Sequence, residues 1–469
     1  MAAKTPLVSV YITNYNYGKY IRQSVESVLN QTMQDFELFI IDDGSTDSSR
    51  KIIEEYAMHP QISIIYQRNK GLNITNNIAL RVSRGKYIMR LDADDFLEPN
   101  ALEIMSSKLE ANPELGLVFP DYFLIDSVNT LIGEVQRLNF SNEVSLLDQP
   151  AHGACTMIRR DFLVALGGYD EDYTCQDGYE LWIKFISHYK VENINKPLFY
   201  YRQHGNNLTS NESRILDTRF RIKENFINKN KIPTPKTLTI IPVRNTMIRG
   251  KNLPLEELAG ETVLKRLVKT VTAAGKVGLV VITSADKEIR EYYEGHLDGL
   301  SDKLHFVERP EEYARMNESL NKTIDFVLDQ DIVKAFGPEA VMTVAIEYPF
   351  ITHEVIDDAV NTLTIFGADS LLSVRPDNNM YYQHDGSGLK PILGQEKYTK
   401  LEREAIYKGV GGIVLSRLDG YRKHGKMLQG KIGHIVVDSK KSIGIFSDFE
   451  LQLSQLLMQS EQEKEAVVS

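Results

Sequence analysis

Hydrophobic and polar positions follow two alternating patterns along the first 120 residues. Short apolar runs typical of buried strands are separated by segments whose apolar residues recur every three to four positions, as Ile21, Val25 and Val28 do. This alternation predicts a parallel sheet with helices on both faces. The predicted strands are 7–13, 36–42, 62–67, 87–91 and 117–119, and the predicted helices are 20–30, 46–57, 74–82 and 99–110.

A second alternation of the same kind begins after residue 237. The predicted strands are 238–241, 277–283, 340–346 and 370–374, and the predicted helices are 263–273, 317–328 and 353–366. The polar segment between the two alternations contains Pro233 and Pro235 and predicts a linker. The pattern therefore predicts two α/β domains, 1–221 and 237–458, joined by a linker at 222–236 and followed by a polar, frayed tail at 459–469.

Length and composition agree with two globular domains and exclude several classes of protein. The chain has 469 residues, which is too long for one ordinary core. A net charge of −10 argues against a general nucleic-acid binder, because phosphate backbones need clustered Lys and Arg. No run of about 18 apolar residues predicts a membrane span, and the first residues do not have the pattern of a signal peptide. With only two cysteines, a cytoplasmic protein is expected.

Ligands of parallel α/β sheets bind beyond the carboxyl ends of the strands, so the loops at those ends are the candidate site. The four loops in the first domain are ITNYN (12–16), IDDGSTDSS (41–49), QRNKGLN (67–73) and RLDADDF (90–96).

The loop RLDADDF has three carboxylates, which repel one another unless a cation neutralises them. Hard oxygen ligands suit Mg²⁺ or Mn²⁺, and such a metal can bind and stabilise a diphosphate leaving group. The alternative is a solvated loop before a helix that starts at Pro99, where acidic residues are favoured. A second acidic loop, IDDGSTD, is expected at the same sheet edge, and this favours the functional interpretation.

Taken in order, these motifs resemble the start of a family 2 glycosyltransferase with the GT-A fold, from residue 5 to about residue 215. The resemblance implies inverting transfer from a nucleoside-diphosphate sugar, with UDP-sugar as the family expectation. It also implies roles for individual residues. The residues that would bind the nucleotide-sugar are Thr13, Tyr15, Asp43, Asn69 and Asp92, and those that would bind Mn²⁺ or Mg²⁺ are Asp92, Asp94 and His204, with Asp95 assisting.

The stretch GGYDEDYTCQDGYELWIKF resembles the part of the family that carries the catalytic base, and Asp177 is the matching carboxylate. One carboxylate near the acceptor hydroxyl would remove its proton during attack. The alternative for Asp177 is a helix N-cap, and both can hold. Asp170, Glu171 and Asp172 are nearby rivals for this role, but they are expected in the exposed turn after Gly167 and Gly168. Trp182 is expected in the core. The family often has Ala-Arg-Asn where this chain has Thr-Asn-Asn at 75–77, so one donor contact is missing.

In the second domain, IPVRNTMIRGKN (241–252) follows a predicted strand and is basic. It could bind a nucleotide phosphate, or it is an ordinary basic loop. The candidate binding residues are Arg244, Arg249, Lys251 and Asn252. Together with VMTVAIEYPFITHEV and SIGIFSDFE, the loop resembles the cytidylyltransferases that make CMP-sialic acid and related sugars, over residues 237 to about 458.

Two departures from that second family bear on its chemistry. The glycines of its Arg-Gly-Gly-Ser-Lys loop are absent, and Gly444 and Phe446 occupy the places of its Asp-x-Asp metal ligands. Neither residue can ligate a hard cation through its side chain. We therefore expect a degenerate domain that binds a nucleotide, docks a partner or joins two copies of the chain.

The two resemblances together predict an α/β protein of two Rossmann-like, nucleotide-diphospho-sugar transferase-type domains. The leading hypothesis is a metal-dependent glycosyltransferase that acts on a glycan or lipid-linked glycan acceptor in bacterial surface polysaccharide synthesis, in the cytoplasm at the inner face of the membrane. One alternative is a bifunctional enzyme that makes a CMP-sugar and also transfers a sugar. Another is a non-catalytic sugar-binding scaffold.

Overall fold

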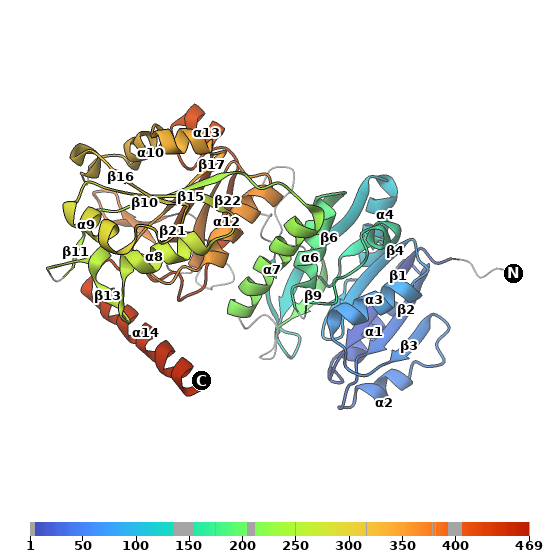
Figure 1. The fold of residues 1–469 in the computed structure, drawn as a ribbon. Coiled ribbons are helices and arrows are strands. Elements are labelled where there is room, and N and C mark those ends of the chain that lie inside the picture. The colour runs from blue at the N-terminus through green and yellow to red at the C-terminus, as the bar shows by residue number, and fades with distance from the viewer. Residues whose placement is uncertain are drawn as a thin grey trace. The chain divides into compact units, whose positions relative to one another are not determined.

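The chain divides into two compact units, Met1–Arg219 and Phe220–Ser469, in a computed structural model (Figure 1). The structure describes residues 5–135, 153–173, 175–203, 212–248, 250–315, 317–377, 379, 381–392 and 406–468. Each unit has its own sheet and its own hydrophobic core, so each is described by itself.

The sheet of the first unit begins with four parallel strands in the order β3-β2-β1-β4. These are β1 (Val8–Asn14), β2 (Phe36–Asp42), β3 (Ile62–Tyr66) and β4 (Tyr87–Asp92). Beyond β4 the sheet continues with β8, which is antiparallel to β4, and then with β6, β9 and β5. Strand β7 pairs with β6. The bounds are β8 (Met157–Arg159), β6 (Leu115–Ile125), β9 (Lys190–Arg202), β5 (Phe96–Leu97) and β7 (Leu131–Val135). The predicted strand–helix alternation is confirmed.

Helices cover both faces of this sheet, as the two separate cores of the unit show. One core includes side chains of α1 (Ile21–Leu29), α2 (Ser49–Glu54) and α4 (Ala101–Ala111). The other includes side chains of α3 (Leu72–Val82), α5 (Arg160–Ala165) and α6 (Asp177–Ile186). Trp182 is buried in the second core, 5.9 Å from the ring of Phe119, which confirms its predicted place.

The second unit has a sheet in the order β16-β15-β10-β17-β21-β18-β22, in which the first four strands are parallel and β21 is antiparallel to both neighbours. The bounds are β10 (Thr237–Pro242), β15 (Val277–Ser284), β16 (Leu304–Glu308), β17 (Ala340–Val344), β18 (Ser370–Asp377), β21 (Ile406–Arg417) and β22 (Ile432–Val436). If β5 and β7 are set aside, the remaining strands of the first sheet correspond one to one with those of the second. They are arranged in the same order relative to their order along the chain, and they run in the same directions.

Short hairpins and helices complete the second unit. The hairpins are β11 (Met247–Ile248) with β12 (Lys251–Asn252), β13 (Glu257–Leu258) with β14 (Glu261–Thr262), and β19 (Tyr382–His384) with β20 (Leu389–Pro391). One core holds α8 (Val263–Ala273), α9 (Lys287–His296), α12 (His353–Ile365) and α14 (Asp448–Val468). The other holds α10 (Leu320–Leu328), α11 (Asp331–Phe336) and α13 (Leu418–His424). The 3₁₀ turns are η3 (Leu253–Leu255) and η4 (Glu311–Ala314).

Two segments have more helix than their polar composition indicated. Helix α7 (Glu212–Asn230) runs through the first part of the predicted linker and leaves 231–236 before β10. Helix α14 extends through most of the predicted tail to residue 468, and Figure 1 shows it, in red, reaching beyond the sheet of its unit. Glu, Gln, Lys and Ala are strong helix formers, so this polar end continues a helix that Leu451 and Met458 anchor in the core.

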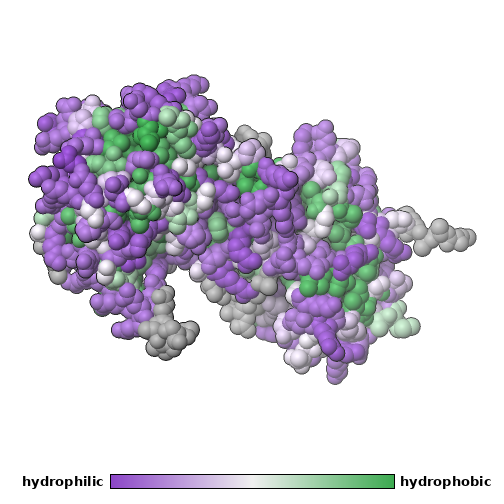
Figure 2. Space-filling view, in the orientation of Figure 1, coloured by the Kyte–Doolittle hydropathy of each residue, from purple (hydrophilic) through white to green (hydrophobic). Residues whose placement is uncertain are grey.

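Figure 2 shows hydrophilic residues over most of the visible face of each unit. Among the helices of the described part of the chain, none combines the length and the apolar character that crossing a membrane requires.

Candidate active site

The carboxyl ends of β1, β2 and β4 bring the predicted polar residues together. Thr13 pairs in register with Asp92, and its Oγ1 donates a hydrogen bond of 3.1 Å to Oδ1 of Asp92. Asn14 pairs with Asp42, and its Nδ2 donates a hydrogen bond of 2.7 Å to Oδ1 of Asp42. Parallel pairing in register therefore joins the predicted nucleotide and metal residues Thr13 and Asp92 at one sheet edge.

Asp43, directly after β2, is buried and holds the loop that follows β3. Its Oδ1 accepts hydrogen bonds from Gln67 Nε2 (2.7 Å) and Lys70 N (2.8 Å), and its Oδ2 accepts one from Gly71 N (2.9 Å). Gly44 has a φ of +81°, and a Cβ there would lie 2.7 Å from the backbone nitrogen of the next loop, so only glycine fits this turn. A carboxylate has about four lone-pair directions, which leaves Asp43 one for a ligand.

Tyr15 and Asn69 lie on the two loops that flank this carboxylate. Tyr15 follows β1 and is exposed, and Asn69 is exposed in the loop after β3. Their side chains are at the edge of the sheet where the other predicted nucleotide residues gather.

Residues 92–95, at the end of β4, form an acidic turn that is largely buried. This rules out the interpretation as a solvated loop. Asp94 is 8% exposed and Asp95 is 1% exposed. Burial, with the nearby charges of Asp94 and Asp92, raises the pKa of Asp95 well above its usual range. Oδ1 of Asp95 accepts a hydrogen bond from the backbone N–H of Arg202 (2.9 Å), and its buried Oδ2 has no partner among the described residues.

The acidic turn fits a divalent cation. Among the described residues, no three His, Cys, Asp or Glu side chains form a cage that could hold a metal by themselves. Mg²⁺ and similar hard cations at nucleotide sites need only one or two carboxylates, because substrate phosphates and water complete the coordination. Asp92 and Asp94 supply such a pair, and the buried Oδ2 of Asp95 has no hydrogen-bond partner among the described residues. His204, the predicted third ligand, lies outside the described residues.

Comparisons with known proteins agree with this geometry. Residues 9–167 match the family described as Glycosyl transferase family 2. An uncharacterized glycosyltransferase of Methanocaldococcus jannaschii is 32% identical over 235 residues, which cover 48% of this chain and 81% of that protein. The chain belongs to glycosyltransferase family 2.

Other relatives of this family 2 glycosyltransferase are much longer. Chondroitin synthase of Escherichia coli is 36% identical over 205 residues, which are 44% of this chain and 30% of the synthase. Hyaluronan synthase of Pasteurella multocida is 31% identical over 206 residues, which are 44% of this chain and 21% of the synthase. The chain therefore spans less than a third of the length of these two relatives. Among solved structures, the complex of TarS from S. aureus with UDP-GlcNAc aligns with a TM-score of 0.40 and 17% identity, covering 47% of this chain and 66% of that one.

Arg202 is a site residue of the glycosyltransferase unit that the sequence did not reveal. Its buried guanidinium donates to the backbone oxygens of Asp94 (2.8 Å) and Asp126 (3.0 Å) and to Oε1 of Gln23 (3.0 Å), and it lies 4.5 Å from the ring of Tyr20. The sequence signal for this residue was an arginine directly after two tyrosines, in YYR (200–202). Arg202 fixes the backbone of the acidic turn and brings a positive charge to it.

Arg90 supplies a second buried cation that the sequence did not single out. Its Nε lies 3.0 Å from Oδ1 of Asp92. A Cβ at Gly153 would lie 2.5 Å from Nη2 of Arg90. Only a glycine therefore allows the backbone at position 153 to pass this close to the guanidinium. The signal was a single arginine inside the apolar strand YIMRLD. With Arg202, it places two buried cations against the acidic turn.

Tyr17, in the loop after β1, is a third such residue. Burial, followed by the charges of Asp94, Asp92 and Asp95, raises the pKa of its hydroxyl. The side chain therefore stays a neutral hydroxyl near the acidic turn.

The predicted base, Asp177, is the first residue of α6. Gln176 occupies the N-cap position with a left-handed φ of +63°, so the N-cap interpretation of Asp177 does not hold. Oε1 of Gln176 accepts a hydrogen bond from Nε of Arg219 (2.8 Å). The side chain of Asp177 lies outside the described residues. Asp170 and Asp172 lie in the expected turn, where Asp172 N donates to Oδ1 of Asp170 (3.0 Å).

Replacing Arg202 by methionine should lower the free energy of unfolding of the first unit by about 3–5 kcal/mol, because buried acceptors and carboxylates lose their cation. Trp182 is the only tryptophan and is buried in this unit, so its fluorescence during urea unfolding reports on this unit alone. Arg22→Met is the control, since Arg22 makes an exposed pair with Glu55, and its unfolding midpoint should hardly change. Equal midpoints for the two variants would contradict the role given to Arg202.

Two of the predicted residues of the basic loop in the second unit have partners within that unit. Arg244 is exposed, while Lys251 Nζ lies 3.1 Å from Oε1 of Glu256. Asn252 Oδ1 accepts a hydrogen bond from Thr246 N (3.3 Å). Arg249 lies outside the described residues. These four residues remain a prediction for nucleotide binding.

An aromatic pair stands where the resemblance would place metal ligands. The rings of Tyr348 and Phe446 meet edge to face with centroids 5.9 Å apart, and Phe446 is 66% exposed. A Cβ at Gly444 would lie 2.5 Å from the ring of Phe446 and 3.0 Å from that of Tyr348. Any side chain at position 444 would therefore have to displace the Phe446 ring.

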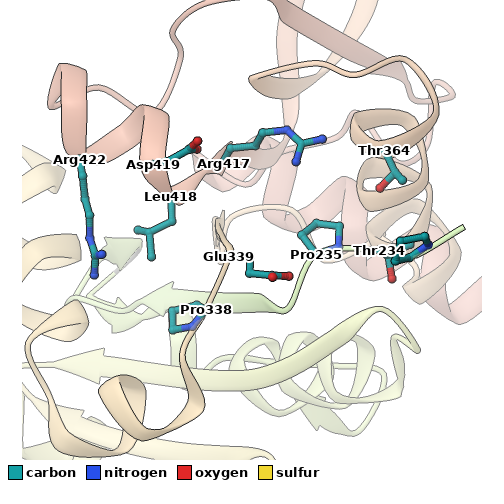
Figure 3. A pocket seen from close by; sticks show the side chains of 10 residues that line it. Thr234, Pro235, Pro338, Glu339, Thr364, Arg417, Leu418, Asp419 and Arg422 are labelled. Atoms are coloured by element: carbon teal, nitrogen blue, oxygen red, sulfur yellow. The ribbon is translucent and has the colours of Figure 1, made fainter.

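A separate open pocket of about 530 Å³ lies in the second unit at the amino ends of β10 and β17 (Figure 3). Arg417, Asp419 and Arg422 line it from the end of β21 and from α13, opposite Glu339 and Pro235. Because sheets of this kind bind ligands at the carboxyl ends of their strands, this pocket is not part of the candidate site.

Proposed function

We propose that the first unit is a metal-dependent, inverting transferase that moves a sugar from a UDP-sugar to a glycan. One observation carries the proposal: Thr13, Asp43 and the buried acidic turn 92–95 meet at the carboxyl edge of one parallel sheet. A pair of acidic loops that are buried at the same edge is the arrangement that a nucleotide diphosphate and its cation require.

The nucleoside would lie between the loops that follow β1, β2 and β3. Asp43 keeps one lone-pair direction for a base N–H, and the exposed ring of Tyr15 offers a face for stacking. Thr13 and Asn69 would complete this subsite. The Asp43 carboxylate accepts hydrogen bonds from an N–H donor, and this suits uracil, which has one at N3, better than cytosine, which has none there.

Asp92 and Asp94 would hold Mn²⁺ or Mg²⁺, with His204 as the third protein ligand. When bound, the cation neutralises the negative charge that develops on the diphosphate leaving group. Arg90 and Arg202 keep the carboxylates in place from the protein side. The Tyr17 hydroxyl, whose pKa is raised by burial and by the charges of the acidic turn, would stay neutral beside the diphosphate.

Asp177 would act as the general base. The acceptor hydroxyl oxygen attacks the anomeric carbon as the bond to the diphosphate breaks, and the hydroxyl proton passes to the Asp177 carboxylate. A single in-line displacement inverts the anomeric configuration, and much of the rate comes from holding the two substrates in that geometry.

The names of the relatives support a role in polysaccharide synthesis. Chondroitin and hyaluronan synthases make glycan chains, and the same family unit here would add a sugar to a glycan or lipid-linked glycan acceptor. An enzyme in the cytoplasm at the inner face of the membrane would meet both a UDP-sugar and such an acceptor.

For the second unit we propose a cytidylyltransferase-like fold without cytidylyltransferase activity. Its sheet has the same strand order as the sheet of the first unit, which supports a common nucleotide-sugar architecture. Gly444 and Phe446 leave no carboxylate for a metal at the predicted place, and the Phe446 ring fills the space beside residue 444. The unit would then bind a nucleotide through Arg244 or join two copies of the chain.

The test uses the full-length protein with a series of donors: UDP-GlcNAc, UDP-glucose, UDP-glucuronic acid and GDP-mannose, each with and without Mn²⁺. Chondroitin and hyaluronan oligosaccharides serve as acceptors. We expect Mn²⁺-dependent release of UDP from at least one UDP-sugar, accelerated by an acceptor, and no pyrophosphate from CTP plus sialic acid. Pyrophosphate release would contradict the proposal for the second unit. Failure of every UDP-sugar to turn over would contradict that for the first.

A further inference from the structure

Helix α3 presents a polar face to the interior of the first unit. Asn73, Asn76 and Asn77 are 5%, 0% and 9% exposed, at the spacing that places them on one side of the helix. A buried amide costs free energy unless it is hydrogen-bonded, so these three side chains need specific partners.

The partners of Asn73 and Asn77 are in the segment that precedes Asp177. Asn73 Nδ2 donates to the backbone oxygens of Asp170 (2.7 Å) and Tyr173 (3.0 Å). Asn77 Nδ2 donates to the backbone oxygen of Tyr169 (2.9 Å), and its Oδ1 accepts from the N–H of the same residue (2.9 Å). The two amides therefore hydrogen-bond to the backbone at both ends of the segment 169–173.

The approach of this segment to α3 depends on a glycine. Gly168 has a φ of +72°, and a Cβ there would lie 2.7 Å from Oδ1 of Asn77. Asn77 Nδ2 also donates to Oε1 of Glu171 (2.8 Å). The segment is therefore packed directly against α3.

The N-terminal end of α3 is also joined to the proposed nucleoside subsite. The N–H of Gly71, the N-cap residue, donates to Asp43, and Gln67 Nε2 bridges Oδ1 of Asp43 and Oγ1 of Thr75 (2.9 Å). The first two turns of this short helix are therefore linked to the Asp43 carboxylate, through Gly71 and Gln67, and also to the segment before α6.

Asn76 takes the place of the arginine that the family often has. It is fully buried, and its Oδ1 accepts a hydrogen bond from the hydroxyl of Tyr11 (3.2 Å). Position 76 therefore points into the unit and does not face the donor, so the departure at 75–77 changes how α3 is anchored.

We propose that Asn73 and Asn77 are positioning residues that set the distance between the bound nucleoside and the start of α6, where Asp177 lies. The inference rests on the proposed function, because it takes Asp177 as the base. Residues 169–173 end four positions before Asp177, so a shift of this segment moves the start of α6 while the Asp43 subsite stays in place.

The test compares Asn73→Ala, Asn77→Ala and the double variant with Asn193→Ala. Asn193 is a buried asparagine of β9 whose Nδ2 donates to the backbone oxygen of Phe119 (3.2 Å), so its loss removes a similar contact outside the α3 network. Two quantities are measured for each full-length variant: the kcat of UDP release from the UDP-sugar that turns over fastest in the donor series, and the Kd of UDP with Mn²⁺ by calorimetry.

We expect kcat to fall about 10²-fold in Asn77→Ala, because misplacement of a reacting group by about 1 Å costs that much, while the Kd of UDP stays within about twofold. Glu171→Gln keeps an oxygen acceptor for Asn77 and should retain the wild-type kcat. Asn193→Ala should also retain it, even if its melting temperature falls as far as that of Asn77→Ala.

Equal kcat values for Asn77→Ala and Asn193→Ala would overturn the positioning role, and so would a parallel loss of UDP binding. Asp177→Asn in the same assay separates this failure from that of the proposed function. If Asp177→Asn is inactive and the asparagine variants are not impaired, the base stands and the positioning role fails. If Asp177→Asn is active, the proposed base itself is wrong.

Discussion

Asn in place of Asp94 should lower the kcat of sugar transfer about 10³-fold, because a metal-bound diphosphate is stabilised by several kcal/mol relative to one without its cation. Asp94 is buried in the acidic turn beside Asp92 and Asp95. An amide at this position has one neutral oxygen ligand and adds no charge. The turn should keep its shape, because Arg202 binds the backbone oxygen of residue 94 and not the side chain.

Metal titration distinguishes this explanation from general damage to the site. The Mn²⁺ concentration for half-maximal activity should rise in Asp94→Asn, and the stabilisation of the first unit by UDP plus Mn²⁺ should disappear, while urea unfolding followed by Trp182 without ligands is unchanged. Asp357→Asn is the control, since this carboxyl of the second unit is buried but only accepts hydrogen bonds from Gly275 N (3.0 Å) and Lys276 N (2.7 Å). A wild-type metal response in Asp94→Asn would remove Asp94 from the metal site.

The parts of the site that follow directly from strand periodicity could be predicted from the sequence. Thr13, Asp43 and Asp92 each lie at or just after the carboxyl end of an apolar strand, and parallel strands bring such ends to one edge. The register that brings Thr13 opposite Asp92 is seen in the structure and was not predicted. Local pattern and one rule of sheet topology were sufficient to locate the loops that carry these residues, whereas their individual roles follow only from the family resemblance.

The buried position of Arg202 could not be predicted, because its partners are far away in the sequence. Arg202 binds the backbone of Asp94 across 108 positions, and Asn77 binds Tyr169 across 92. A single arginine in a strand pattern predicts an edge or a surface, and only the packing of β9 beside the acidic turn makes Arg202 a buried cation.

Strands with mixed polarity were also missed or shortened. The sequence predicted only residues 117–119 of β6, whose later part contains Pro120 and Asp121, and it did not predict β9, which contains Lys196 and Pro197. Both strands pair with each other over most of their length, and this pairing is non-local. The common strand order of the two sheets rests on such pairings, so it is visible only in the structure.

Asp177→Asn should lower kcat by about 10²–10⁴-fold, the usual contribution of a general base. The amide cannot accept the acceptor proton, but it is close in size to the carboxylate, so α6 should start at the same residue. The Kd of UDP with Mn²⁺ should be unchanged, because Asp43 and the acidic turn, and not α6, would bind the nucleotide. The acidic limb of the pH–rate profile should disappear, because that limb reports protonation of the base.

The rival carboxylates give this prediction its control. Asp172 is exposed in the turn before α6, and its N–H closes that turn on Asp170, so Asp172→Asn changes a nearby charge without removing the proposed base. We expect Asp172→Asn to keep the acidic limb and most of its kcat. The reverse result, with a larger loss in Asp172→Asn than in Asp177→Asn, would move the base to the turn. Added Mn²⁺ should not rescue Asp177→Asn but should partly rescue Asp94→Asn, since only the latter would lack a metal ligand.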